Sequence, residues 1–138
     1  MVMWLARRPK YIPLFFAVGW FLACAPRVMR KRNLRDFVRI LRAGFYPRGP
    51  REAIHDIAAF WLIHFFPDRN TCYGRALTLY RFLDEPDRDV KLHMGIEPQR
   101  RGGELRGHAW VSLRGAIVEG PPEAFDGKLR EVPLEQPA

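Results

Sequence analysis

The stretch from residue 106 to residue 120, RGHAWVSLRGAIVEG, constrains the fold more than any other part of the chain. Two short runs of half-apolar residues flank Arg114–Gly115, and this pattern is typical of a β-hairpin with a two-residue turn. Side chains in such a hairpin alternate between the two faces of the sheet, so the turn also predicts the register. The expected cross-strand pairs are Leu113 with Ala116, Trp110 with Glu119, and His108 with Pro121.

A histidine near the start of this hairpin and an acid near its end suggest a functional pair. In the expected register His108, Trp110 and Ser112 share one face, and Glu119 lies on that face one diagonal step from His108. Diagonal neighbours are within reach of long side chains, so a carboxylate there can orient the imidazole. We therefore expect Glu119 to orient His108.

A cysteine opens the helix that we expect in TCYGRALTLYRFL, residues 71–83. Asn70 or Thr71 can cap this helix, which puts Cys72 in its first turn. The free N–H groups and the helix dipole there favour a thiolate and can hold a developing oxyanion. Gly74 leaves room beside the sulfur. The buried stripe of the helix is expected to comprise Tyr73, Ala76, Leu77, Tyr80 and Leu83.

A cysteine, a histidine and an acid in this chain order suit acyl transfer, with Cys72, His108 and Glu119 as nucleophile, base and orienting acid. The competing structural interpretation makes His108 a polar residue at a strand start and Glu119 a surface residue. A metal site formed by Cys72, His93 and His108 is a third interpretation, but the chain has no short paired spacing of ligands. We expect neither a metal nor a cofactor.

The Cys helix, a strand ending in Met94–Gly95, and GHAWVSLRGAIVEG together resemble the transglutaminase-like cysteine proteases of lasso-peptide maturation. The resemblance covers about residues 70–125. It implies that Cys72 is the nucleophile and His108 the general base. The third catalytic residue in that family is an acid, usually Asp, which lies just past the second strand of the hairpin. Here Glu119 lies near that point, and two further candidates follow it, Glu123 and Asp126.

The resemblance also implies the fold class, α+β and papain-like, with N-terminal helices and a Cys-bearing helix packed on a small antiparallel sheet. The implied function is removal of the leader segment from a ribosomally made precursor peptide. A separate leader-recognition protein is expected to deliver that precursor, and a lasso cyclase is a further expected partner. Two alternatives are an acyltransferase or amidase acting on another substrate, and a non-catalytic, membrane-associated scaffold protein.

The N-terminal half is basic and contains a long apolar run. Residues 1–69 carry 13 Lys and Arg against 4 Asp and Glu, whereas residues 70–138 carry 10 against 11. Residues 11–29 are mostly apolar, lie between basic clusters and approach the minimum length for a bilayer span. A membrane anchor, a buried core helix and an export signal are the three interpretations. We expect residues 1–69 to form a helical region and residues 70–138 the protease core, within one compact unit.

Several further helices and strands are expected from the spacing of the apolar residues and from the positions of helix- and strand-breaking residues. Residues 33–45 form an amphipathic helix and residues 52–66 an apolar helix, in which His55 and His64 are partly buried. Residues 90–96 and 129–132 form strands. The polar loop of residues 97–107 precedes His108, and its arginines are expected to contact an acidic leader or partner: Arg100, Arg101 and Arg106.

The aromatic residues are not interleaved with the basic residues, which argues against nucleic-acid binding. The presence of only two cysteines favours a reduced, cytoplasmic setting.

Overall fold

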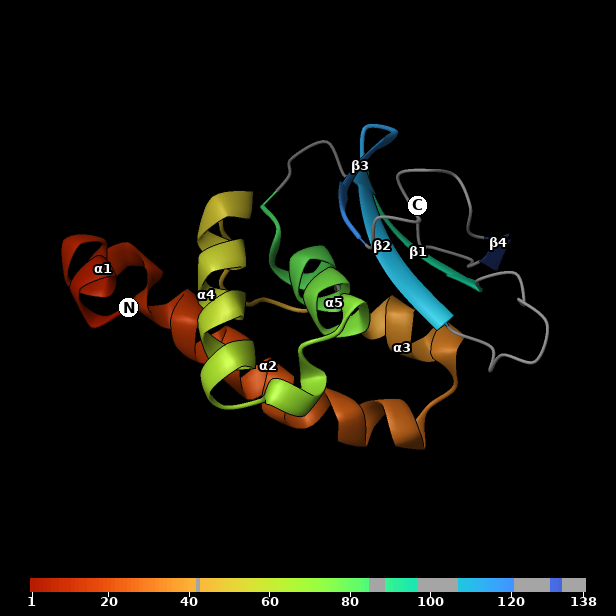
Figure 1. The fold of residues 1–138 in the computed structure, drawn as a ribbon, viewed down its shortest axis with the longest axis horizontal. Helices are drawn as coiled ribbons and strands as arrows, with labels where there is room; N and C mark the ends of the chain where they lie inside the picture. The colour runs from red at the N-terminus through yellow and green to blue at the C-terminus, as the bar shows by residue number, and fades with distance from the viewer. Residues whose placement is uncertain (42, 85–88, 97–106, 121–129, 133–138) are drawn as a thin grey trace.

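The computed structural model describes residues 1–41, 43–84, 89–96, 107–120 and 130–132. The fold is α+β, as expected, with helices packed on one small antiparallel sheet (Figure 1). The helices are α1 (Val2–Arg7), η1 (Pro9–Tyr11), α2 (Ile12–Lys31), α3 (Leu34–Leu41), α4 (Arg51–His64), η2 (Pro67–Arg69) and α5 (Cys72–Phe82). The strands are β1 (Val90–Ile96), β2 (Gly107–Leu113), β3 (Ala116–Glu119) and β4 (Arg130–Val132).

The sheet has the strand order β3-β2-β1-β4, and all of its pairs are antiparallel. The alternating pattern of β1 puts its apolar residues on the side of the sheet that faces α5. α5 lies between the sheet and the long helices α2 and α4 (Figure 1). The side chains buried at this contact include Leu92, Met94, Ala109, Val111, Leu77 and Tyr80.

One hydrophobic core joins both halves of the chain. Buried residues of α2, α3 and α4 belong to the same cluster as those of α5, β1 and β2. Leu62 of α4, Ala76 of α5 and Val111 of β2 are all inaccessible to solvent within it. The expected boundary at residue 69 therefore falls inside a shared core, and α5 is packed by elements from both sides of it.

Helix α2 is the apolar segment that the sequence predicts to be helical, and it continues through Pro26 to Lys31. Within the described residues it is the one helix long and apolar enough to cross a membrane, over Pro9–Lys31, and a third of its most apolar window is buried. One side of it, which includes Leu14, Val18 and Leu22, packs into the core. α2 is thus in part a core helix.

The connection between α3 and α4 is attached to the far end of α5. Gly49 forms an isolated parallel bridge with Leu83. Its N–H donates to the carbonyl oxygen of Phe82 at 2.9 Å, and its own carbonyl accepts from the N–H of Asp84 at 2.9 Å. This short pairing holds the C-terminal end of α5 against the start of α4.

Helix α3 is shorter than expected, and two histidines differ from the expected burial. α3 ends at Leu41, and Gly44 follows with a positive φ of 88°, so the helical periodicity does not reach Phe45, which is fully exposed. His55 and His64 were expected to be partly buried, and both are exposed on α4. The expectation was wrong because the core side of α4 is formed by other residues: Ala53, Ile54, Ile57, Ala58 and Leu62.

The hairpin forms with the expected turn, but its register changes after two pairs. Arg114 and Gly115 both have positive φ, 51° and 81°, as a type I′ turn requires. Leu113 pairs with Ala116 and Ser112 with Ile117, but Val111 pairs with Glu119. Val118 is therefore an extra residue, a β-bulge, and the predicted pair of Trp110 with Glu119 is wrong.

The bulge has a partner in α4. The Arg51 guanidinium donates from Nη2 to the carbonyl oxygen of Val118 at 2.8 Å. A carbonyl that a bulge removes from the ladder needs another donor, and Arg51 supplies it. Because the side-chain period of a strand is two, the one extra residue moves Glu119 to the opposite face of the sheet from the expected one.

Candidate active site

Cys72 is the first residue of α5, and the local sequence explains why the helix begins there. Thr71 is the N-cap: its backbone is extended and its hydroxyl accepts the N–H of Gly74 at 3.4 Å. The other capping candidate, Asn70, instead accepts two hydrogen bonds from Arg75 at 2.8 and 3.1 Å. A Cβ at position 74 would collide with the backbone carbonyl oxygen of Arg69, so a glycine is needed for the turn from η2 into α5.

The first turn of α5 offers two backbone donors beside the sulfur. The N–H groups of Gly74 and Arg75 are taken by the hydroxyl and the carbonyl of Thr71. In the described part of the chain, the N–H groups of Cys72 and Tyr73 have no acceptor. Donors of this kind at a helix N-terminus can stabilise an oxyanion that forms on a carbonyl attacked by the Cys72 sulfur.

The structure brings Cys72 and His108 together. The Cys72 Sγ lies 3.8 Å from the His108 Nδ1, across the contact between α5 and β2. Gly95 is directly opposite His108 in the β1–β2 register, so no side chain of β1 crowds the imidazole from that position. The second ring nitrogen, Nε2, is buried and faces away from the sulfur. A distance of 3.8 Å is long for proton transfer, and such contacts commonly shorten when substrate binds.

Tyr73 is a part of the site that the sequence did not suggest. A Cβ on Gly107 would collide with the Tyr73 hydroxyl, so that phenol lies against the backbone immediately before His108. Burial, and in second place the charge of Cys72, raise the pKa of Tyr73 above its usual value. The phenol therefore stays protonated at neutral pH and keeps its hydrogen-bond donor. A glycine directly before His108 was the available signal for a bulky neighbour at that point.

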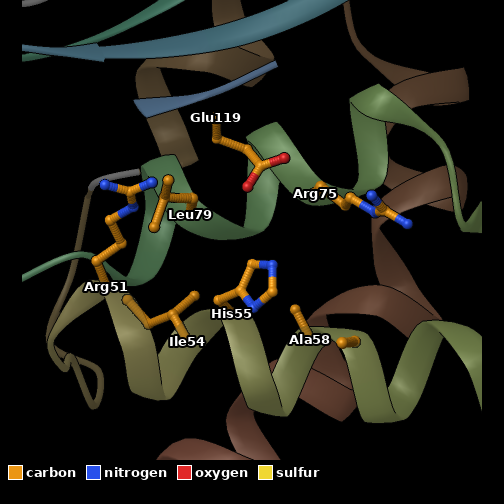
Figure 2. A pocket seen from close by; sticks show the side chains of 8 residues that line it. Arg51, Ile54, His55, Ala58, Arg75, Leu79 and Glu119 are labelled. Atoms are coloured by element: carbon orange, nitrogen blue, oxygen red, sulfur yellow. The ribbon is translucent and has the colours of Figure 1, made fainter. Parts of the chain in front are cut away.

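Glu119 does not approach His108. Within the described residues no hydrogen bond or ion pair joins the two. The Glu119 side chain instead points from β3 into a cavity of about 160 Å³ between α4 and α5 (Figure 2). Arg51, His55 and Arg75 also line this cavity. The choice of Glu119 as the orienting acid depended on the regular register, which the bulge at Val118 removes. Glu123 and Asp126 lie outside the described residues.

His93 takes part in a separate polar cluster on the face of the sheet opposite α5. Its Nε2 lies 2.7 Å from the Ser112 hydroxyl and its Nδ1 lies 2.5 Å from a Glu131 carboxylate oxygen. The Trp110 ring stacks on the imidazole at 5.5 Å, 9° from parallel. His93 therefore ties together β2, β1 and β4, and the structure does not bring it to Cys72 and His108. Among the described residues no three side chains form a group that could hold a metal ion.

Comparison with known proteins identifies a family. The sequence profile of the transglutaminase-like superfamily matches residues 22–127, well over half of the chain and including both Cys72 and His108. No curated protein and no solved structure matches. Proteins of this superfamily usually use a cysteine for catalysis, in keeping with a thiol at a helix N-terminus beside an imidazole. The chain belongs to the transglutaminase-like superfamily.

Proposed function

We propose that the protein is a cysteine peptidase that removes the leader segment from a ribosomally made precursor peptide, as in lasso-peptide maturation. The observation that carries the catalytic part is the 3.8 Å approach of the Cys72 Sγ to the His108 Nδ1 at the N-terminus of α5. The substrate class is taken from the resemblance of the Cys helix and the HAWV hairpin to the lasso leader peptidases. The cytoplasm is the proposed location, since both thiols are free.

The proposed reaction proceeds through a thioester. His108 accepts the thiol proton at Nδ1 while the Cys72 sulfur attacks the scissile carbonyl carbon. The N–H groups of Cys72 and Tyr73 hold the oxyanion of the tetrahedral intermediate. His108 then returns the proton to the leaving amine, which releases the fragment on the C-terminal side of the cut. Water, deprotonated by His108, hydrolyses the thioester and restores the thiol.

The orienting acid is proposed to be Glu123 or Asp126, the next acids after the hairpin. A separate leader-recognition protein is proposed to present the precursor, and a lasso cyclase to act on the product. The arginines of the polar loop before His108, which lie outside the described residues, are proposed to contact an acidic stretch of the leader or of the partner: Arg100, Arg101 and Arg106.

The direct test mixes the full chain with a candidate precursor and a leader-binding partner and follows the peptide by mass spectrometry. Leader release that disappears in Cys72→Ala supports the proposal. Full cleavage by Cys72→Ala contradicts it. A product in which the scissile amide has been replaced by an amide to a second amine, without net hydrolysis, would assign the same thioester to an acyltransferase. An amine can take the place of water in the last step.

Iodoacetamide is expected to label Cys72 at least about tenfold faster than Cys24 at neutral pH. Both thiols are half-buried, but Cys72 has a helix N-terminus and an imidazole beside it, whereas Cys24 lines an apolar groove formed by α2 and α3. Peptide mapping of the folded protein over time measures both rates. Cys24→Ser should leave the fast phase unchanged and Cys72→Ser should remove it; faster labelling of Cys24 would refute the assignment.

Glu119→Gln is expected to retain leader-peptidase activity within about threefold, because its carboxylate lies in the α4–α5 cavity and does not contact His108. Loss of a true orienting acid typically lowers kcat by up to about 10⁴-fold. Asp126→Asn and Glu123→Gln form the matched pair, and one of them should show a loss of about 10²-fold or more. A collapse of activity in Glu119→Gln alone would restore Glu119 as the orienting acid.

A further inference from the structure

A row of large apolar side chains is exposed along one side of α2. Ile12, Phe16 and Trp20 follow one another at four-residue intervals, so they share one side of the helix. Their exposed fractions are 41%, 64% and 74%. We call these three residues the α2 stripe. Scattered apolar residues on a surface need no explanation, but three aligned bulky ones in the most apolar helix do.

The opposite side of α2 is fixed in the core, so the helix is not free to leave it. Leu14, Val18 and Leu22 are almost fully buried there. The indole of Trp61 donates to the carbonyl oxygen of Phe15 at 2.9 Å, and Arg69 donates to that of Leu22. A bilayer-spanning α2 would have to surrender these contacts with α4 and η2. Helix α2 therefore has two apolar sides, one buried in the core and one exposed on the surface of the domain.

The exposed apolar surface continues beyond α2. Ring contacts run from Phe16 to Phe15, from Phe15 to Trp61 and from Trp61 to Phe65, with centroids 4.9 to 5.4 Å apart. Phe65, just past the end of α4, is 59% exposed. The α2 stripe and the end of α4 are thus parts of one connected patch.

Positive charge borders the stripe at both ends. The chain has no Asp or Glu before Asp36, although it has eight Lys and Arg in that interval. Arg7, Arg8 and Lys10 are exposed just before α2, and Arg27 and Arg30 are exposed in its C-terminal part. A helix with an exposed aromatic and aliphatic side and basic residues beside it can bind the surface of an anionic membrane in the plane of the interface.

We propose that the α2 stripe binds the surface of a bilayer that contains anionic lipids, with α2 parallel to the membrane plane. The stripe enters the boundary between headgroups and acyl chains, the basic residues at its ends contact lipid phosphates, and the buried side of α2 remains in the core. An interfacial helix needs one apolar side only, whereas a spanning helix needs an apolar surface all round. The proposal is independent of the peptidase reaction.

Flotation of the full chain with vesicles tests it. The protein should float with phosphatidylcholine vesicles containing about 30% phosphatidylglycerol, and at least tenfold less of it with phosphatidylcholine alone, because each basic residue near an anionic surface contributes about fivefold to binding. Half-molar salt should weaken binding. The emission of Trp20 should shift to the blue on binding, and Trp20→Phe should lose this shift while it still floats.

Matched variants distinguish binding through the α2 stripe from non-specific hydrophobic adsorption to vesicles. Phe16→Ser/Trp20→Ser should bind anionic vesicles at least tenfold more weakly, and Arg27→Gln/Arg30→Gln should weaken the preference for anionic lipid by about 25-fold. Ile96→Ser, which removes an exposed apolar residue from β1, should bind as the parent does. Circular dichroism checks that each variant is folded. Failure to float with either lipid would overturn the proposal, as would equal flotation of the parent and the stripe variant.

Discussion

Cys72→Ala and His108→Gln are each expected to lower the rate of leader release by about 10³-fold or more. The sulfur is the proposed nucleophile, and the imidazole is the base within 3.8 Å of it. The double variant should be little worse than either single one, because nucleophile and base act as a unit and their effects do not add. Single-turnover assays with precursor, partner and excess enzyme measure these rates.

The controls for these two variants come from the same chain. Cys24→Ser removes the other thiol and should leave the rate unchanged. Near-native thermal unfolding of Cys72→Ala and His108→Gln would show that the loss is chemical, since neither side chain belongs to the core cluster. A Cys72→Ala enzyme with a rate within tenfold of the parent would exclude the thioester mechanism.

Gly74→Ala is expected to destabilise the fold by about 2–3 kcal/mol and to abolish fast alkylation of Cys72. Alanine normally stabilises a helix relative to glycine by about 0.5–1 kcal/mol. The expected change in the free energy of unfolding therefore has the opposite sign to that of a typical Gly→Ala substitution in a helix. The cause is the collision of the new Cβ with the carbonyl oxygen of Arg69, a backbone atom that cannot rotate away. Denaturant titration measures the change in the free energy of unfolding.

Thr71→Ala provides the comparison for that variant. It removes the cap hydroxyl that accepts the Gly74 N–H and should cost about 1 kcal/mol, with the turn itself left intact. If Gly74→Ala proved as stable as the parent, the tight turn between η2 and α5 would not be what positions Cys72.

The part of the site that could be predicted depends on local rules. Thr71 caps a helix because of its hydroxyl, and Arg114–Gly115 adopts positive φ because type I′ is one of the two-residue turns whose twist matches that of the strands it joins. These rules place Cys72 at a helix start and His108 on a strand. Their spatial proximity does not follow from these rules, because strand alternation alone puts His108 on the face of Trp110 and Ser112; the structure shows it as the 3.8 Å approach of the Cys72 Sγ to the His108 Nδ1.

The position of Glu119 could not be predicted, because it depends on a β-bulge without a local signal. Val118 is an ordinary strand residue, and the donor that accommodates its freed carbonyl is Arg51, 67 positions away in the sequence. One extra residue inverts the face on which Glu119 lies. The exposure of His55 and His64 escaped prediction for a related reason, since the core-facing side of α4 is decided by packing against α2 and α5.

The attachment of Gly49 to Leu83 has a consequence for the precision of the site. α5 is held at its start by the turn that Gly74 permits and at its end by the Gly49 pairing. A helix that is fixed at both ends cannot shift along its axis. A shift of one residue would displace the Cys72 thiol by about 1.5 Å. Much of the entropy of aligning sulfur with imidazole is therefore lost when the chain folds, before any substrate arrives.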